Sequence, residues 1–363
     1  MLNKMDFKHR RDQLRSSLEA KALHGLLITH PPNRFYLSGF ELRDPQPGES
    51  SGCLFIDAQD EDWLLTDARY LEAARRIWAE ERIFIYSSKT VAAIKDFLFS
   101  QGKRRIGIEA NAMTVSMFEG LTAANDSSIS LKLVPTNGLT EALRLCKDPS
   151  ELECLRASCR LNHELMNRIP DWLSHDLTEK DLAWKIEKFF RQHGAEELAF
   201  STIVAAGRNA SLPHAIPGLE QLPLNGPVLI DAGCRLNNYC SDQTRTFWLG
   251  NFPTSDFKSA MARVREAQEH ALGHIKPGLP IAEAYQAAQK IFANYGIESY
   301  FTHSLGHGIG LETHEAPSLG PNNQNTFLPG MVITVEPGLY YPHWGGIRWE
   351  YMVLVTDDGM EIL

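Results

Sequence analysis

Four carboxylates in two similar settings constrain this chain of 363 residues more than any other feature. Asp231 follows the apolar run 226–230, and Glu336 follows the apolar run 331–335, so each acid ends a segment typical of a buried strand. A second acid follows each of these after a short turn. A solvated acid seldom borders a buried strand, so we expect two acid-bearing strand pairs to face one cleft, against the alternative of separate acids on solvated turns.

The first pair consists of Asp231 and Asp242, on either side of a polar turn. If 236–237 forms the tip of a hairpin, the two aspartates lie directly opposite on one face, with Cβ atoms about 4.5–5.5 Å apart. Two unpaired anions at that distance repel, so either one is protonated or a cation lies between them. Glu336 and Glu350 repeat the arrangement. Four carboxylates without a cation are costly to bury, and a divalent metal ion accounts for them most simply.

The glycine-rich stretch 302–315 places His303, His307 and His314 close together. Its glycines let the backbone approach closely whatever the imidazoles bind. Three polar loop histidines without a ligand are the alternative interpretation. Adding His307 to the four acids gives a mixed oxygen and nitrogen set that can hold two metal ions with shared carboxylates.

Two further polar residues accompany the acids. Thr244 lies two residues after Asp242, so the two share a strand face. Arg348 lies two residues before Glu350 in the same way. Arg348 can partly neutralise the cluster and orient a carboxylate, and a surface salt bridge is its alternative interpretation.

The chain length predicts two domains, each large enough to bury its own core. In residues 1–146 strand-like and helix-like segments alternate, which indicates an α/β domain, with a strand over 25–28 and a turn over 31–33. The second domain, 147–363, begins where the segment 148–150 suits the start of a helix.

The second domain contains a weak internal repeat. Helical stretches within 149–193 lead to the strand that ends at Asp231, and a second set within 255–295 leads to the strand that ends at Glu336. We therefore expect two similar αβ halves that bring all four acids into one cleft, in a chain that is α/β (α+β) overall.

Composition argues against several classes of partner. The 36 basic and 45 acidic residues give a formal charge of -9, which disfavours nucleic acid or an anionic membrane. The segment 1–20 lacks the apolar centre of a signal peptide, and no run reaches the ~20 apolar residues of a membrane span. The six cysteines show no CxxC spacing, so we expect them to be reduced and the protein to be soluble and cytoplasmic.

These residues resemble a family of metallopeptidases that includes aminopeptidase P, prolidase and, more distantly, methionine aminopeptidase and creatinase. In the second domain the resemblance is carried by Asp231-Ala-Gly, Ser241-Asp-Gln-Thr-Arg-Thr, the stretch 303–315, Val335-Glu-Pro-Gly-Leu-Tyr and Gly346-Ile-Arg-Trp-Glu. In the first domain it is carried by 26–30, 34–40, 65–70 and 106–110. The resemblance implies a creatinase-like amino-terminal domain followed by a pita-bread catalytic domain with pseudo-twofold halves.

The resemblance also implies a ligand set for two divalent metal ions. In that set Asp231 chelates one ion, and Asp242 with Glu350 bridges both. His307 and Glu336 complete the coordination of the second ion. Manganese is the expected metal, and cobalt, zinc and iron accept the same oxygen and nitrogen ligands.

Further residues match substrate-side positions of the family. Glu336 is implied as the proton shuttle between the attacking water and the leaving nitrogen. His303 and His314 are implied as hydrogen-bond donors to the scissile carbonyl or the tetrahedral intermediate. His214 matches another substrate-side histidine, and Arg348 belongs to the same constellation.

The implied activity is that of a dinuclear metal-dependent exopeptidase, an Xaa-Pro aminopeptidase or Xaa-Pro dipeptidase, that cleaves between an amino-terminal residue and proline. The resemblance further implies a homodimer, and the substrate would be a peptide with proline in second position. Two alternatives have the same fold. One is a creatinase-like amidinohydrolase that works without metal, and the other is a catalytically inactive binding protein.

The sequence departs from the family pattern at two places. Trp349 and Tyr351 flank Glu350 where relatives commonly have an aliphatic residue and an acid, so the surroundings of that ligand can differ. Many dipeptidases of the family carry an arginine shortly after the position of His314, suited to a dipeptide's carboxylate. No lysine or arginine occurs here between His314 and Glu336, which favours aminopeptidase P over the dipeptidase.

Overall fold

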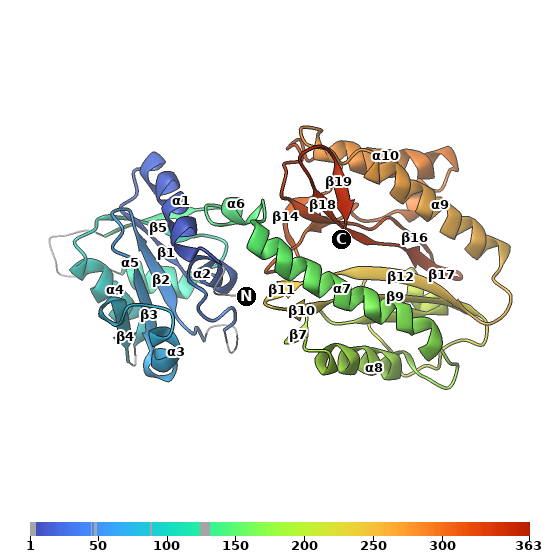
Figure 1. The fold of residues 1–363 in the computed structure, drawn as a ribbon, viewed down its shortest axis with the longest axis horizontal. Coiled ribbons are helices and arrows are strands. Elements are labelled where there is room, and N and C mark those ends of the chain that lie inside the picture. Colours follow the sequence, from blue (N-terminus) through green and yellow to red (C-terminus); the bar gives the residue numbers. More distant parts are fainter. Residues whose placement is uncertain (1–4, 45, 47–48, 88, 124–130) are drawn as a thin grey trace. The chain divides into compact units, whose positions relative to one another are not determined.

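The computed structural model describes residues 5–44, 46, 49–87, 89–123 and 131–363, drawn as ribbons in Figure 1. Its contacts divide the chain into two compact units, residues 2–144 and Leu145–Leu363. The sequence placed this division two residues later, between Cys146 and Lys147. Within the described residues, none of the helices is both long and apolar enough to cross a membrane.

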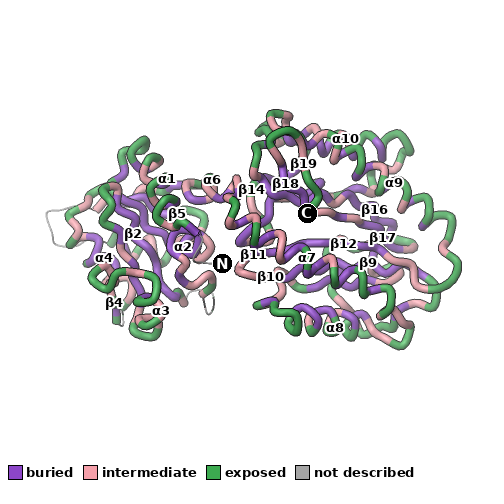
Figure 2. The backbone as a smooth tube through the Cα atoms, viewed as in Figure 1, coloured by how far each residue is buried: buried purple, intermediate pink, exposed green. Residues whose placement is uncertain are grey.

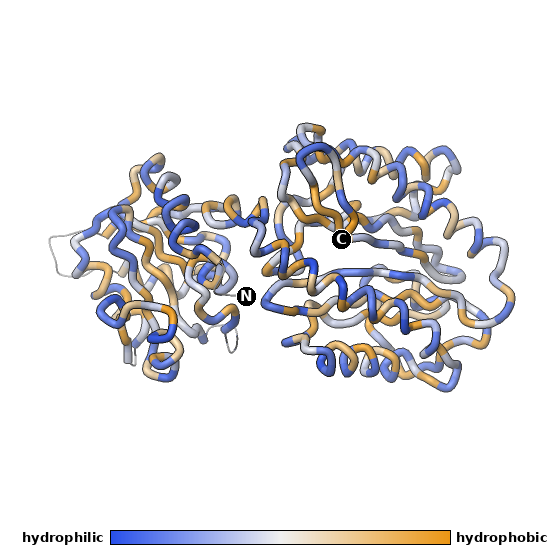
Figure 3. Tube along the Cα trace, viewed as in Figure 1, coloured by the Kyte–Doolittle hydropathy of each residue, from blue (hydrophilic) through white to orange (hydrophobic). Residues whose placement is uncertain are grey.

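The amino-terminal unit is built on a six-stranded sheet with the strand order β4-β3-β2-β1-β5-β6. Its strands are β1 (Gly25–Ile28), β2 (Cys53–Asp57), β3 (Trp63–Asp67), β4 (Ile83–Tyr86), β5 (Arg105–Glu109) and β6 (Lys132–Thr136). Its helices are α1 (Phe7–Ala20), α2 (Pro31–Ser38), α3 (Leu71–Arg75), α4 (Thr90–Ser100), α5 (Val115–Thr122) and α6 (Glu141–Arg144). Figure 3 shows hydrophobic residues concentrated along the strands of this unit.

One local prediction in this unit is wrong. The segment 31–33 is not a turn, because Pro31 and Pro32 begin helix α2. Proline suits the first turn of a helix, since the N–H that it lacks has no partner there and its φ is already helical. Gly39 ends the helix in the left-handed conformation at φ 75°.

The carboxyl-terminal unit consists of two successive αβ halves, which confirms the predicted internal repeat. The first half contains α7 (Pro149–Trp172), α8 (Glu179–Gln192), β7 (Glu197–Leu198), β8 (Ile203–Ala206), β9 (Gly226–Ala232), β10 (Cys234–Leu236), β11 (Tyr239–Cys240) and β12 (Gln243–Leu249). The second half contains α9 (Ser255–Leu272), α10 (Ile281–Asn294), β13 (His307–Gly308), β14 (Glu315–Ser318), β15 (Val332–Val335), β16 (Gly338–Tyr341), β17 (Gly345–Arg348), β18 (Tyr351–Val355) and β19 (Met360–Ile362).

Strands occupy the middle of this unit, with α7 and α8 on one side and α9 and α10 on the other (Figure 1). In the first half, Val228 and Ile230 of β9 join α7 and α8 in one buried cluster. In the second half, Ile333 and Val335 of β15 join α9 and α10 in another. Every residue of β9 and of β15 is buried, and Figure 2 shows this for β9.

Strand alternation then decides where the acids point. Because neighbouring residues of a strand face opposite sides of a sheet, Asp231 faces away from the helices that Ile230 contacts. Glu336, which directly follows Val335, likewise faces away from the helices that Val335 contacts. Each half therefore buries its apolar side chains against its own helices and directs its acids toward the middle of the unit.

Candidate metal centre

The first pair of acids comes from the long hairpin of the first half. Strands β9 and β12 are antiparallel, and Asp231 pairs with Thr244. The tip is Asn237-Asn238, both in the left-handed region at φ 53° and 69°. The predicted tip at 236–237 is therefore wrong, and Asp242 lies diagonal to Asp231 on the same face. Asparagine adopts the left-handed conformation more readily than leucine, which explains the shift of the turn.

The second pair comes from the other half and keeps the predicted register. Strands β16 and β17 pair Gly338 with Arg348, and the N–H of Trp349 donates to the carbonyl of Pro337 at 3.4 Å. Continuing this register places Glu336 opposite Glu350, as the sequence spacing predicted.

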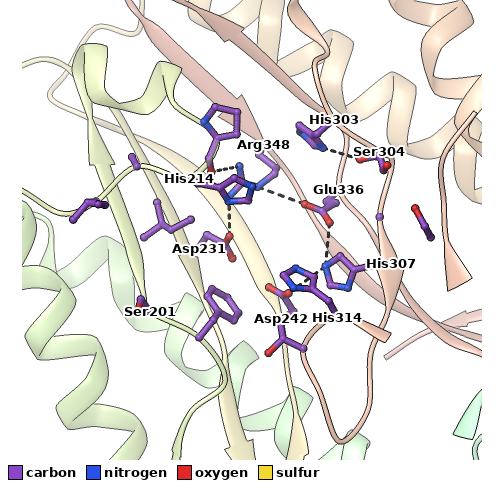
Figure 4. A pocket seen from close by; sticks show the side chains of 18 residues that line it. Ser201, His214, Asp231, Asp242, His303, Ser304, His307, His314, Glu336 and Arg348 are labelled. Atoms are coloured by element: carbon purple, nitrogen blue, oxygen red, sulfur yellow. Dashed lines mark hydrogen bonds and ion pairs between the residues drawn. The ribbon is translucent and has the colours of Figure 1, made fainter. Parts of the chain in front are cut away.

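The two halves bring the acids together with His307. Carboxylate oxygens of Asp231, Asp242 and Glu350 all lie within 4.8 Å of one another. His307 Nε2 lies 3.7 Å from Asp242 Oδ2 and 3.4 Å from Glu336 Oε1. Figure 4 shows four of these side chains, all except Glu350, turned toward one another. All five predicted ligand positions thus converge.

The electrostatics of this cluster fit bound cations. Burial, and then the neighbouring carboxylates, raise the pKa values of Asp242 and Glu350 well above their usual range. Burial raises the pKa of Glu336 to about 7, although Arg348 opposes the shift. Asp231 Oδ1 and Glu350 Oε1 are buried without a hydrogen-bond partner in the described part of the chain. Oxygens left in this state are the ligands that divalent metal ions take.

Arg348 organises the carboxylates from the side. Its Nη2 donates to Asp231 Oδ2 at 2.7 Å, and its Nε donates to Thr244 Oγ1 at 3.0 Å. Thr244 Oγ1 donates in turn to Glu350 Oε2 at 2.8 Å. The arginine side chain is only 3% exposed, so the alternative of a surface salt bridge does not apply.

His303 is half-buried, and both of its ring nitrogens have a partner. Its Nδ1 lies 2.7 Å from the carbonyl of Ser304, and its Nε2 lies 2.9 Å from the hydroxyl of Tyr340. Burial lowers the pKa of His303 to about 4, so the ring is neutral and carries one proton. A carbonyl only accepts, so that proton lies on Nδ1, and Nε2 accepts from Tyr340. Tyr340 itself accepts from Arg348 Nη1 at 2.8 Å.

In this tautomer the one N–H of His303 faces the carbonyl of Ser304. The role that the resemblance implied for His303, a donor to the substrate, stays a prediction. The place of His303 in the chain from Arg348 through Tyr340 makes it a partner of the tyrosine hydroxyl.

The other two histidines retain the predicted placement beside the pocket. His314 packs edge-on against His307, with ring centroids 4.3 Å apart. Burial lowers the pKa of His314, which favours its neutral form. His214 lines the same pocket, next to Asp231 and Arg348 in Figure 4.

The glycines of the histidine stretch serve packing between strands. A Cβ at Gly306 would lie 2.0 Å from the carbonyl oxygen of Thr334, and one at Gly308 would lie 2.1 Å from that of Ala316. Any side chain there would push β13 away from its neighbours. The expectation that these glycines admit a ligand is therefore replaced by close approach of the backbone to other strands.

Part of the pocket wall could not be predicted from the sequence. Phe200, Ile203, Ala215 and Ile216 form an apolar side of the cavity that contains the acids and histidines. They come from β8 and its flanking segments, where no periodic pattern separates lining residues from core residues. Tyr340 was also missed, although it follows Glu336 closely in the chain.

The departure at Trp349 has a visible structural role. Its ring lies between two guanidinium groups, with Arg245 and Arg265 each 4.3 Å from the ring centroid. Arg245 Nη1 also donates to the carbonyls of Thr244, at 2.8 Å, and Glu350. The tryptophan thus helps hold the backbone that carries one of the predicted ligands.

The carboxylates and the imidazole predicted as metal ligands meet between two αβ halves, an arrangement that fits a hydrolytic enzyme with the pita-bread fold. Residues 153–357 match metallopeptidase family M24, and residues 10–146 match the creatinase/prolidase amino-terminal domain. The chain belongs to metallopeptidase family M24.

Relatives of known structure or name agree over nearly the whole chain. It is 30% identical to the Xaa-Pro dipeptidase of Pyrococcus furiosus over 98% of this chain and 97% of that protein. The solved Xaa-Pro dipeptidase from Bacillus anthracis is 31% identical, with a TM-score of 0.90 and coverage of 98% and 97%. The solved X-Pro aminopeptidase from Thermotoga maritima is 28% identical, with a TM-score of 0.83 and coverage of 94% and 95%.

These comparisons confirm the predicted fold and the predicted metallopeptidase. They support that prediction over the creatinase-like amidinohydrolase and over the inactive binding protein. Membership of the family also implies divalent metal ions as cofactors.

Proposed function

We propose that this protein is an exopeptidase that hydrolyses the bond between an amino-terminal residue and proline, using two divalent metal ions. The observation that carries the proposal is the convergence of five candidate ligand side chains from both halves, four of which, all except Glu350, line one pocket. The Xaa-Pro dipeptidase and X-Pro aminopeptidase relatives support the choice of proline.

We assign the metal ligands as the resemblance implied. Asp231 would hold one ion, Asp242 and Glu350 would bridge, and His307 with Glu336 would hold the other. Two such cations, when bound, would neutralise the cluster, polarise the scissile carbonyl and lower the pKa of water. Manganese is our first choice, because a carboxylate-rich set with one imidazole suits it.

Glu336 is the side chain best suited to move a proton. In the metal-free protein burial raises its pKa to about 7, so this carboxyl group holds a proton more readily than a free glutamate, a property suited to proton transfer. We propose that it takes a proton from the attacking water and delivers it to the proline nitrogen as the bond breaks. Arg348, whose Nε lies 3.8 Å from Glu336 Oε2, limits how far that pKa rises.

The pocket suits the ends of the proposed substrate. The carboxylates can attract the substrate's amino terminus, and the apolar wall of Phe200, Ile203 and Ile216 can cover the flanking side chain or the proline ring. His214 and His314 are our candidates for donors to the scissile carbonyl, since both line the pocket.

The pocket favours longer peptides over dipeptides. Among its described lining residues Arg348 is the one lysine or arginine. All three of its nitrogens are engaged, with Asp231, Thr244, Tyr340 and Pro213. No cation of this wall is left to bind the carboxylate of a dipeptide. We therefore propose activity of the aminopeptidase P kind, although the dipeptidase relatives are as similar in sequence.

The proposal is tested by removing metal with a chelator, restoring manganese, and comparing leucyl-proline with leucyl-prolyl-alanine. We expect both to be cut and the tripeptide to have the larger kcat/KM. Preference for the dipeptide would overturn the length assignment alone. Absence of cleavage of both peptides with manganese, cobalt, zinc or iron would overturn the peptidase assignment.

We also propose a homodimer in a reducing, cytosolic setting. The homodimer rests on the family resemblance, and light scattering of the purified protein tests it. All six cysteines lie in the described part of the chain and are free thiols, five of them buried, which suits a reducing compartment.

A further inference from the structure

The segment between β8 and β9 carries His214 to the pocket, and little apolar burial holds it close to that histidine. The buried apolar residues nearest to His214, Ala210 and Ala215, are small side chains that contact a cluster around Tyr340. The larger Leu222 is buried, at 2% exposed, but it lies eight residues beyond His214, next to α8. Leu212 is 54% exposed, and Ile216, which lines the pocket, is 84% exposed. We therefore expect the placement of His214 to depend substantially on polar contacts.

Glu179, the first residue of α8, supplies such contacts from a buried position, 4% exposed. Its Oε1 accepts from the backbone N–H of Ala206 at 2.7 Å, and its Oε2 accepts from the backbone N–H of Gly218 at 2.7 Å. The side-chain amide of Asn209 donates to both oxygens at 2.9 Å. Two of these donors precede His214 in the chain, and one follows it.

The part of the segment that follows His214 is also held by backbone hydrogen bonds. The N–H of Lys180 donates to the carbonyl of Gly218 at 3.1 Å, and the N–H of Leu222 donates to that of Leu177 at 2.8 Å. The start of α8 thus already holds this side. What the carboxylate adds is the connection from there to Ala206 and Asn209.

We propose that Glu179 is a positioning residue for His214. Its carboxylate joins the two sides of the segment and fixes the histidine at the substrate, and this role rests on the proposed function of the pocket. We call Glu179 with Ala206, Asn209 and Gly218 the Glu179 latch. The latch needs a carboxylate, because both oxygens must accept, whereas a glutamine amide has one accepting oxygen and directs N–H groups at other donors.

A double-mutant cycle with manganese-loaded enzyme and leucyl-prolyl-alanine tests the latch. We expect Glu179→Gln to lower kcat/KM by about tenfold and to have almost no further effect when His214→Ala is already present. Metal content should equal that of the parent protein. Independent, additive effects of the two substitutions, or full activity of Glu179→Gln, would overturn the proposal.

Glu151→Gln provides a matched control in the same unit. Glu151 is a buried glutamate in the first turn of α7, where it accepts from the N–H of Asp148 at 3.1 Å and from the hydroxyl of Tyr239 at 3.0 Å. Its loss should lower stability and leave the effect of His214→Ala on kcat/KM unchanged. If Glu151→Gln also abolished that effect, coupling to His214 would reflect general loosening and the latch would be rejected.

Amide hydrogen exchange tests the latch by a measurement that does not depend on enzymatic activity. In Glu179→Gln the amides of Ala206 and Gly218 should exchange at least about tenfold faster, with β9 and β12 unchanged. Unchanged exchange at both amides would overturn the latch, even if the parent cleaves its peptide. If the parent cleaves nothing, the proposed function fails while exchange still tests the latch. Should Glu179→Gln not fold, Asn209→Ala removes one donor and is tested in the same cycle and by exchange.

Discussion

The two halves of the catalytic unit look like repeats but contribute unequally to the site. Of the five candidate ligands and Arg348, the first half supplies the two aspartates, Asp231 and Asp242. The second half supplies the other four, Glu336, Glu350, His307 and Arg348. The buried charge of Asp231 is therefore compensated from the other half, by Arg348 at 2.7 Å. The cluster joins the halves and is the proposed metal site.

The register of the acids differs between the halves as well. Glu336 and Glu350 are opposite each other just beyond the paired residues of β16 and β17, whereas Asp231 of β9 is diagonal to Asp242, which directly precedes β12. A diagonal pair on one face is more widely spaced than a direct pair. The two aspartates, whose side chains are shorter, therefore have a different spacing from that of the two glutamates. The proposed metal site is thus formed by two halves that are similar but not identical.

Removing the shared ligand should have the largest effect. Asp242→Asn takes a charge from the position where both halves meet, and we expect kcat/KM on leucyl-prolyl-alanine to fall by about 10³-fold or more, about 4 kcal/mol. Metal content, measured by mass spectrometry, should fall with it. Asp358→Asn, at an exposed turn, is the control and should change neither quantity. Retained metal and activity in Asp242→Asn would show that the halves do not share this ligand.

The second largest effect is expected when Arg348, which links the second half to Asp231 of the first, is replaced. Arg348→Met leaves Asp231 buried without its cation, and such losses cost about 3–5 kcal/mol of unfolding free energy in metal-free protein. In loaded enzyme we expect kcat/KM to fall about 10–100-fold, because the carboxylates lose their orientation. Urea unfolding and steady-state kinetics measure the two effects.

Arg156→Met is the matched control for that substitution. Arg156 pairs with Glu361 at 2.6 Å, but both side chains are substantially exposed, at 35% and 45%. Exposed pairs contribute about 0–1 kcal/mol, so this variant should remain near the parent in both assays. Equal losses in the two variants would contradict a special role for the link between the halves.

The third prediction concerns pH and metal-free protein. Burial raises the folded pKa of Glu336 to about 7 from 4.5, so the folded state holds a proton that the unfolded chain has already released. Stability from this group is present below pH 4.5 and is lost as pH rises toward 7. We expect a loss of about 3 kcal/mol, observed as the difference between parent and Glu336→Gln.

Metal should reverse that trend, because it binds the deprotonated cluster and stabilises the folded state more as pH rises. Thermal unfolding at several pH values, with and without manganese, provides the measurement. If the metal-free parent and Glu336→Gln changed in parallel from pH 4.5 to 7, the raised pKa would be wrong.

The sequence allowed the fold and the convergence of the acids to be predicted for physical reasons. Apolar runs ending at Asp231 and Glu336 specified buried strands, and the two successive sets of helices and strands indicated two αβ halves. Acids beside buried strands require partners, so a shared metal site followed from charge alone. These inferences use local pattern and elementary electrostatics.

What could not be predicted depended on tertiary contacts. The hydrogen bonds of His303 with the carbonyl of Ser304 and the hydroxyl of Tyr340 are not revealed by any spacing. The latch around Glu179 joins a helix start to backbone groups far along the chain. The hairpin tip was misplaced because the conformations of Asn237 and Asn238 were not weighed against the symmetric spacing of two acids.

That tip gives the smallest and most local prediction. Asn238 adopts φ 69°, where alanine costs about 1 kcal/mol more than asparagine or glycine. Asn238→Ala should therefore lower Tm by about 2–4 °C, whereas Asn238→Gly should match the parent. The backbone N–H of Asn238 still donates to Glu196 Oε2, at 3.1 Å, in both variants, so the register that sets Asp231 and Asp242 should survive. Unchanged kcat/KM and metal content would show that register, rather than turn residue, controls the first half's acids, and a loss of metal with Asn238→Ala would show the opposite.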